Sequence, residues 1–348
     1  GGITSHAAVV ARGWGIPAVV GAGEIVIEDD GLHIGDRVIA PGTEISIDGR
    51  TGEVFLGGAE TSLVEAPPEL AELLDWADRI RLGADVPVTV RANADNSADA
   101  AHARHLGAEG IGLCRTEHMF LAEDRLPLVR RLILTDDPEV EREALADLEV
   151  AQQADFEGIL VAMDSLPVTV RLLDPPLHEF LPGLEPLLVA EALGELDDIG
   201  RTELAAVRRL NEVNPMIGTR GVRLGVVKPG LYQMQVRALF RAVQTVAAQG
   251  RSPVVEVMIP LVVDPAEMAL AREWVAEALA ELGHDATASV GAMLETPRAA
   301  LVAGELAEVS DFFSFGTNDL TQLTFAFSRD DVGSRLVPEY LRTGLLPA

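Results

Sequence analysis

Cysteine is nearly absent from this sequence: Cys114 is the single one among 348 residues, and neither a Cys-x-x-Cys nor a His-Glu-x-x-His spacing occurs. One cysteine excludes an internal disulfide and fits a reducing compartment, so we expect a cytoplasmic protein. The missing spacings argue against a structural zinc site and against a zinc protease. Apolar runs such as residues 158–163 are far too short to cross a bilayer. The composition is that of a globular protein.

Basic residues are scarce as well. Lys and Arg together number 27 against 55 Asp and Glu, which gives a formal net charge of −28, and Lys228 is the only lysine. This balance argues against general affinity for nucleic acids or membranes. A site for an anionic, phosphorylated substrate has to overcome this unfavourable overall field with local arginines.

The chain begins with residues 1–12, Gly-Gly-Ile-Thr-Ser-His-Ala-Ala-Val-Val-Ala-Arg. Thr4 and Ser5 are helix N-cap types, and residues 7–12 predict a short helix. His6 would then lie in the first turn, where backbone N–H groups and the helix dipole favour a bound anion. A neutral imidazole there can act as a nucleophile toward a phosphoryl group. From the spacing alone, an ordinary helix-terminal histidine remains the alternative.

The sequence pattern divides the chain into three parts. Residues 1–58 read as a small mixed unit with short strands, and residues 59–83 read as a linker with a helix over 69–82. From residue 84 to 348, apolar strands alternate with helices. Strands are predicted at 37–40, 44–47 and 53–56 in the first part and at 88–93, 110–115, 168–174, 254–260, 290–295 and 312–319 in the third, with helices near 97–106, 139–162, 202–212, 229–249 and 265–282.

Repeated β/α units with polar groups at the strand ends indicate an α/β fold of the (β/α)₈ barrel (TIM) type. A shorter strand around residues 216–218 would be the seventh, and no eighth strand is evident before residue 348. We therefore predict a barrel that lacks its last strand.

Polar residues lie at the carboxyl ends of the predicted barrel strands. They include three arginines and several carboxylates: Arg115, Arg171, Asp174, Arg220, Glu295, Asn318 and Asp319. Each alone could be an ordinary ion pair at a barrel rim. Together they suit a small, doubly anionic phosphorylated acid, because arginine forks bind phosphate and carboxylate oxygens and two carboxylates can hold one Mg²⁺.

Several segments resemble a known family. Residues 1–21 closely resemble the phosphohistidine segment of the phosphoenolpyruvate-utilising enzymes. Within that family, RTEHMF (115–120), LLDPPLHEF (172–180), NPMIGTRG (214–221), MLETPRAA (293–300) and GTNDLTQ (316–322) are similar to the pyruvate, phosphate dikinase branch. Phosphotransferase-system enzyme I and phosphoenolpyruvate synthase share the layout but differ in the first two of these five segments.

The resemblance implies a function and a set of site residues. Residues 1–58 would be part of a swivelling phosphohistidine domain of β/β/α type. On it, His6 would carry phosphate between a nucleotide site and the barrel, where the phosphoryl group passes between His6 and pyruvate enolate. Thr4 matches a position that is regulated by phosphorylation in some members, with helix capping as the alternative. The implied barrel residues are Arg115 and Arg171 on the phosphoryl group, Arg220 as an assistant, Glu295 and Asp319 on Mg²⁺, and Gly316, Thr317 and Asn318 on the substrate.

The resemblance also implies parts that this sequence does not contain. The family's nucleotide-binding domain would precede residue 1, and the eighth strand and a proton-donating cysteine in a Cys-Gly-Glu motif would follow residue 348. Cys114 directly precedes Arg115 on a predicted strand, so we expect it to pack away from the site. We expect a fragment that cannot run the full ATP-dependent reaction alone and that pairs as a homodimer in the parent enzyme. Enzyme I of the phosphotransferase system and a catalytically incomplete phosphoenolpyruvate-binding module remain alternatives.

Overall fold

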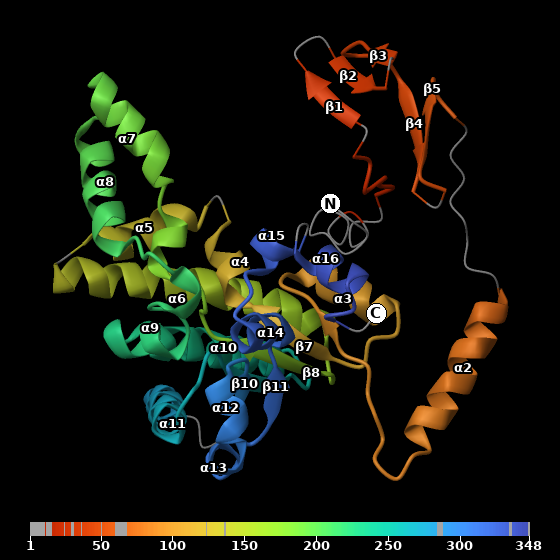
Figure 1. Cartoon of the computed structure of the whole chain (residues 1–348). Coiled ribbons are helices and arrows are strands. Elements are labelled where there is room, and N and C mark those ends of the chain that lie inside the picture. Colours follow the sequence, from red (N-terminus) through yellow and green to blue (C-terminus); the bar gives the residue numbers. More distant parts are fainter. Residues whose placement is uncertain are drawn as a thin grey trace. The chain divides into compact units, whose positions relative to one another are not determined.

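A computed structural model gives the structure of this chain. It describes residues 11, 16–23, 25–28, 31–35, 37–49, 51–59, 68–122, 124–135, 137–283, 288–333 and 336–346. The chain forms two compact units, one of residues 1–80 with 328–348 and one of residues 81–327 (Figure 1).

The first unit contains two small antiparallel sheets. β1 (Ile25–Glu28), β2 (Gly31–Ile34) and β3 (Arg37–Ile39) form one sheet, while β4 (Ile45–Asp48) and β5 (Glu53–Leu56) form the other. β3, β4 and β5 confirm the strands predicted from the sequence. The turn between β4 and β5 is built from Asp48, whose carboxylate accepts a hydrogen bond from Thr51 N (3.2 Å), and from Gly52 at φ 77°. That backbone conformation favours glycine.

Helices also accompany these strands among the residues that the structure describes. α2 (Pro68–Leu82) confirms the helix predicted over 69–82, and α15 (Arg329–Val332) and α16 (Leu336–Arg342) lie near the other end of the sequence. The predicted domain boundaries at residues 58 and 84 stay predictions.

The second unit is built on a parallel sheet of six strands whose spatial order follows the chain: β6 (Ala92–Asn93), β7 (Ile111–Arg115), β8 (Pro167–Arg171), β9 (Val254–Ile259), β10 (Ser289–Leu294) and β11 (Phe313–Phe315). Every neighbouring pair is parallel. The middle strands are buried, with Val168, Val257 and Ala292 at most 1% exposed. Such continuous apolar burial is typical of parallel sheets that are covered on both faces.

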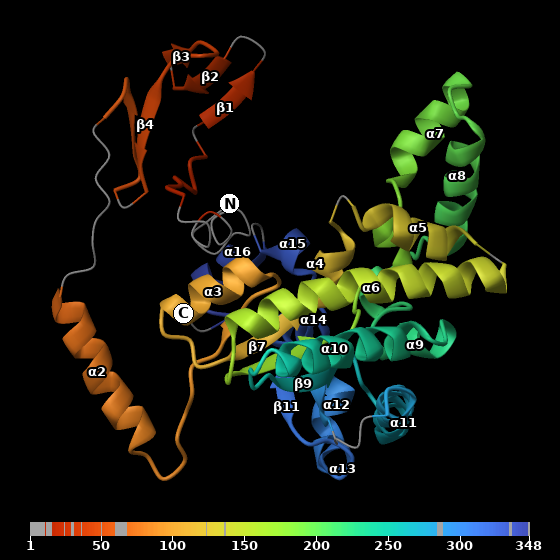
Figure 2. The ribbon, with the colours of Figure 1, turned by 180° about the vertical axis from the view of Figure 1, so that it is seen from behind.

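Helices connect and cover the strands of this sheet. They are α3 (Ser97–His105), α4 (Thr116–Phe120), α5 (Leu126–Leu134), α6 (Pro138–Ala162), α7 (Leu184–Leu193), α8 (Asp198–Leu210), α9 (Val222–Val227), α10 (Leu231–Ala248), α11 (Pro265–Glu281), α12 (Pro297–Leu301), α13 (Ala303–Ala307) and α14 (Thr317–Phe325), with the 3₁₀ turns η1 (Leu177–Phe180) and η2 (Pro215–Ile217). α6 and α10 run side by side, which is clearest from behind in Figure 2. No helix in the described ranges is both long and apolar enough to span a membrane.

The parallel α/β architecture confirms the predicted fold class, as a half-barrel sheet of six strands in the described residues. The predicted strand at 216–218 is wrong, because this segment forms η2. Pro215 has no N–H for a sheet ladder, and the next N–H groups bond locally, from Ile217 to the Asn214 carbonyl and from Gly218 to the Pro215 carbonyl (both 3.3 Å).

Candidate active site

The candidate site lies at the carboxyl ends of the parallel strands. Arg115 is the last residue of β7 and Arg171 the last of β8, and the sheet register places the two directly opposite each other. Asp95 follows β6, and Glu295 directly follows β10. Because all strands run the same way, their carboxyl ends share one edge of the sheet, where open α/β sheets bind ligands.

Arg115 is held by Asp95 through several bonds. Its Nη2 donates to Asp95 Oδ2 (2.6 Å), its Nε lies 3.1 Å from the same oxygen, and its backbone N–H donates to Oδ1 (2.8 Å). His118 Nδ1 is also 2.8 Å from Asp95 Oδ2. Burial alone would raise the pKa of Asp95, but the hydrogen bonds from His118 and Arg115 outweigh it and lower that pKa to about 2. Asp95 is therefore ionised at neutral pH.

Arg171 lies deeper in the site, with 9% of its surface exposed. Nη2 pairs with Glu117 Oε1, and Nη1 pairs with Asp174 Oδ2 (3.2 Å) and approaches the sulfur of Met293 (3.8 Å). Burial would lower the pKa of Arg171, but the charges of Asp174 and Glu117 raise it above its usual value. Arg171 stays charged, and its buried Nε has no hydrogen-bond partner among the described residues.

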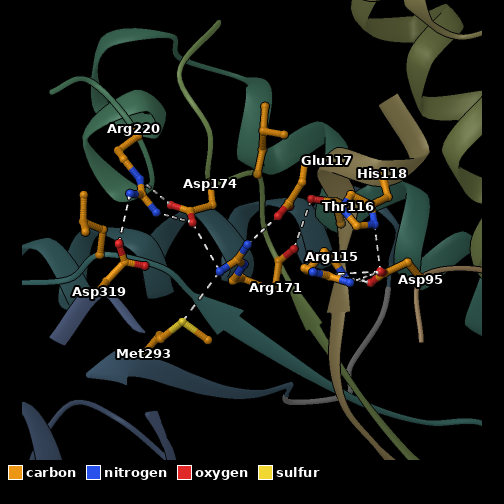
Figure 3. A network of polar contacts seen from close by, with 12 residues as sticks. Asp95, Arg115, Thr116, Glu117, His118, Arg171, Asp174, Arg220, Met293 and Asp319 are labelled. Carbon is orange, nitrogen blue, oxygen red and sulfur yellow. Dashed lines mark hydrogen bonds and ion pairs between the residues drawn. The ribbon is translucent and has the colours of Figure 1, made fainter. Parts of the chain in front are cut away.

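Arg220 completes a row of alternating charges, which Figure 3 shows from Asp319 to Glu117. Its Nε and Nη2 donate to the two oxygens of Asp174 (3.1 and 2.6 Å), and its Nη1 lies 3.4 Å from Asp319 Oδ1. Burial opposes the charge of Arg220, yet Asp174 and Asp319 raise its pKa above the usual value. Asp174 thus holds two arginines at once.

A buried polar network fixes the turn between Arg171 and Asp174. Leu173 N–H donates to Gln235 Oε1 and the Leu173 carbonyl accepts from the Tyr232 hydroxyl, both at 2.9 Å. Tyr232 and Gln235 lie on α10 and are at most 1% exposed. Helix α10 therefore determines how the end of β8 presents its charged side chains.

Glu295 is fully buried. Its Oε1 accepts a hydrogen bond from Leu261 N (2.7 Å), while its buried Oε2 has no partner among the described residues. Burial, together with the nearby charge of Asp174, raises the pKa of Glu295 to about 7. Gly316 packs against this carboxylate, since a Cβ there would lie 2.6 Å from Glu295 Cβ and would also overlap Oε2. The arrangement leaves one carboxylate oxygen available to a cation.

The donor set fits a hard divalent cation. Within the described ranges, no group of three His, Cys, Asp or Glu side chains lies together as a complete metal site. Mg²⁺ is commonly bound through one or two carboxylates, with water or substrate oxygens completing its shell. The unpartnered oxygen of Glu295 and the neighbouring Asp319 match that requirement.

The structure brings most of the predicted site residues together at one edge. Arg115, Arg171, Arg220, Glu295 and Asp319 converge there. Gly316 caps the start of α14, whose first turn carries Thr317 and Asn318, both exposed, and Asp319. His6 and Thr4 lie outside the described residues. Cys114 is fully buried in the hydrophobic core, as predicted, and burial raises the pKa of its thiol.

The sequence analysis gave no role to Asp95, Glu117 or His118. Asp95 follows the predicted strand at 88–93 by two residues, so the rule that polar groups gather after barrel strands could have found it. Glu117 and His118 lie inside the segment RTEHMF, and only the structure shows that they face Arg171 and Asp95.

A parallel α/β sheet of barrel type, with paired arginines and buried carboxylates at its strand ends, defines the class of protein: an α/β barrel-type domain with a charged site at the carboxyl edge of its sheet. Residues 75–342 match the family model described as PEP-utilising enzyme, PEP-binding domain. Residues 1–52 match the model described as PEP-utilising enzyme, mobile domain. The chain belongs to the phosphoenolpyruvate-utilising enzyme family.

Three similar curated proteins are pyruvate, phosphate dikinases. "Pyruvate, phosphate dikinase 1, chloroplastic" of Arabidopsis thaliana is 48% identical over 99% of this chain and 36% of its own length. "Pyruvate, phosphate dikinase 2" of Zea mays is 48% identical over 99% of this chain and 39% of its own length. "Pyruvate, phosphate dikinase 2" of Oryza sativa subsp. japonica is 45% identical over 99% of this chain and 39% of its own length. The chain thus spans little more than a third of the length of these relatives.

Proposed function

We propose that this chain binds phosphoenolpyruvate and pyruvate at the strand ends and exchanges the phosphoryl group with His6, as the matching part of a pyruvate, phosphate dikinase. One observation carries the proposal: three guanidinium groups, each fixed by a carboxylate, lie at the same edge as the buried Glu295. Membership of the family and the names of the similar proteins support it. The parent reaction would convert ATP, pyruvate and phosphate to AMP, phosphoenolpyruvate and diphosphate.

In this proposal the arginines bind the anionic groups of the substrate. Arg115 and Arg171 hold phosphoryl oxygens, Arg220 assists, and the segment Gly316, Thr317 and Asn318 contacts the three-carbon acid. Guanidinium forks that are oriented before the ligand arrives stabilise charge as it moves, without reorganising at the moment of reaction.

Glu295 and Asp319 would hold Mg²⁺, which supplies Lewis-acid neutralisation of the substrate oxygens when it is bound. The unpartnered Oε2 of Glu295 supports this assignment. Gly316 leaves the room that the carboxylate needs, because a side chain there would displace it.

The chemical step forms one bond and breaks one. An imidazole nitrogen of His6 attacks phosphorus, the bond between phosphorus and the enolic oxygen breaks, and its electron pair stays on the enolate of pyruvate. The model described as mobile domain covers His6, which supports a carrier role for this residue. The proposal has four further parts. Nucleotide is bound outside this chain, and two copies pair as a homodimer. The protein is cytoplasmic, and Thr4 is a site of regulation by phosphorylation.

Binding is tested by calorimetry with Mg²⁺ and phosphoenolpyruvate. We expect the unsubstituted chain to bind and Arg171→Ala to bind roughly ten- to a hundredfold more weakly, since a charge-assisted contact is removed. Arg201→Ala is the control, because Arg201 forms an exposed pair with Asp198 on α8. Failure of the unsubstituted chain to bind would refute the proposal.

The carrier role is tested with phosphoenolpyruvate that carries ³²P. We expect label on the chain and its loss in His6→Ala, while His105→Ala at the end of α3 keeps it. Labelling that persists in His6→Ala would remove His6 as the carrier.

A further inference from the structure

Each arginine of the site is held by a carboxylate that precedes it in the chain: Arg115 by Asp95, Arg171 by Glu117 and Arg220 by Asp174. We propose that Asp95 is a positioning residue that orients Arg115 for the phosphoryl group of the substrate. This inference rests on the proposed function, because it concerns an arginine of the same site. It assigns a role to a residue outside the predicted set.

The bonds of Asp95 leave one side of Arg115 available. Asp95 takes the Nε and Nη2 of that guanidinium, whereas Nη1 donates to none of the described residues. The side chain of Arg115 is 35% exposed, compared with 10% for Arg171 and 13% for Arg220. A ligand at the strand ends can therefore reach Nη1.

Asp95 itself is fixed by donors on both of its oxygens. Oδ1 accepts from the backbone N–H of Arg115, and Oδ2 accepts from Nη2 of Arg115 and lies 2.8 Å from His118 Nδ1 (Figure 3). Its side chain is only 10% exposed. Rotation of this carboxylate would break bonds on every side, so its orientation sets that of the guanidinium.

Arg115 depends on this contact more than its neighbours depend on theirs. Arg171 is paired with both Glu117 and Asp174, and Arg220 with both Asp174 and Asp319. Within the described part of the chain, Arg115 has Asp95 alone as its ion-pair partner. Without that carboxylate, a partly exposed arginine would sample several rotamers and would lose conformational entropy when it bound a ligand.

The first experiment compares two ligands in Asp95→Asn. Asparagine keeps the shape and one acceptor oxygen but removes the charge. With Mg²⁺ present, we expect phosphoenolpyruvate to bind about tenfold more weakly, as when one charge-assisted contact is loosened. Oxalate, a planar dianion that lacks a phosphoryl group, should keep its affinity within about twofold. Equal loss for both ligands would show general damage to the site and would overturn the inference.

A matched control lies at the opposite end of the sheet. Asp311 pairs with Arg272 (2.9 Å) and accepts the backbone N–H of Val290 (2.8 Å), so it too combines a guanidinium partner with a backbone N–H donor. We expect Asp311→Asn to leave both affinities unchanged. A weakening like that of Asp95→Asn would trace the effect to stability rather than to positioning.

A double-mutant cycle gives the second test. If Asp95 acts through Arg115, Asp95→Asn has no further effect on phosphoenolpyruvate binding once Arg115 is alanine. Additive losses would overturn the inference. Should Asp95→Asn not fold, Asp95→Glu replaces it, because the longer side chain keeps the charge but moves the carboxylate relative to the Arg115 guanidinium, and the same loss for phosphoenolpyruvate alone is expected.

The outcomes separate this inference from the proposed function. If the unsubstituted chain does not bind phosphoenolpyruvate, the proposed function fails and the inference fails with it. If that chain binds and Asp95→Asn binds equally well, only the inference fails.

Discussion

At the scale of single residues, Glu295 combines full burial with one unpartnered oxygen, and its pKa is about 7 instead of the usual 4.5. A carboxyl group whose pKa is higher in the folded than in the unfolded chain binds more protons when folded. Stability is therefore lost as pH rises from about 4.5 through 7. In the metal-free protein, the ionised side chain destabilises the fold.

The loss of stability with rising pH can be tested. In EDTA, we expect Glu295→Gln to raise the thermal midpoint relative to the unsubstituted chain at pH 8, by an amount equivalent to about 3 kcal/mol. The difference should nearly disappear at pH 4, where the glutamate is neutral in the folded chain and mostly neutral in the unfolded chain. Thermal unfolding followed by circular dichroism across this range measures it. A difference that is constant with pH would contradict a buried, titrating Glu295.

Gly316 provides a second prediction at this scale. Its φ of −82° suits any residue, but a Cβ would overlap Glu295. We expect Gly316→Ala to displace the carboxylate and to weaken Mg²⁺-dependent binding of phosphoenolpyruvate at least tenfold in calorimetry. Gly304 in α13 is the control, because nothing lies within 4 Å of a Cβ added there. Gly304→Ala should leave binding unchanged.

At the scale of secondary structure, helix α10 supports the end of strand β8 through the Tyr232 hydroxyl and the Leu173 carbonyl. We expect Tyr232→Phe to lower stability by about 1–2 kcal/mol, since it leaves a buried carbonyl without its donor. Affinity for phosphoenolpyruvate should fall as well, because Leu173 lies between Arg171 and Asp174. Tyr340→Phe, in α16, should not alter this affinity. Stability lost without any change in affinity would show that α10 does not position the site.

The sequence predicts those elements whose signal is local. The apolar runs that end at Arg115 and Arg171 identify β7 and β8 and place both arginines at one edge, because parallel strands share their carboxyl ends. The strand prediction at 216–218 is wrong because a short apolar stretch after proline does not show whether a neighbouring strand is close enough to pair with it. α7 was missed because its apolar residues occur on all sides, so helical periodicity is weak.

The pairing within the site depends on three-dimensional neighbours. Asp95 and Arg115 are 20 residues apart, and Arg220 and Asp319 are 99 apart. Sequence position shows that each residue ends a strand or begins a helix, but the choice of partner depends on the register of the sheet and on side-chain rotamers. The arginines were predicted as a group, whereas the carboxylates that orient them appear only in the folded chain.

At the scale of the whole molecule, the site has to attract an anion to a chain with a net charge of −28. The site itself has no surplus of positive charge, since three arginines face Asp95, Glu117, Asp174 and Asp319. Attraction therefore depends on short, directional contacts and on a bound cation, while the long-range field repels the substrate.

Short-range and long-range forces respond differently to salt. Between 10 mM and 100 mM ionic strength the Debye length falls from about 30 Å to about 10 Å, so repulsion by distant carboxylates is screened while contacts within the site persist. At a fixed 1 mM Mg²⁺, we expect the association rate of phosphoenolpyruvate, measured by stopped flow, to rise severalfold over this range. The dissociation rate should change less, because it reports the local bonds. An association rate that falls with salt would mean that the arginines of the site steer the anion from a distance, against the charge of the rest of the chain.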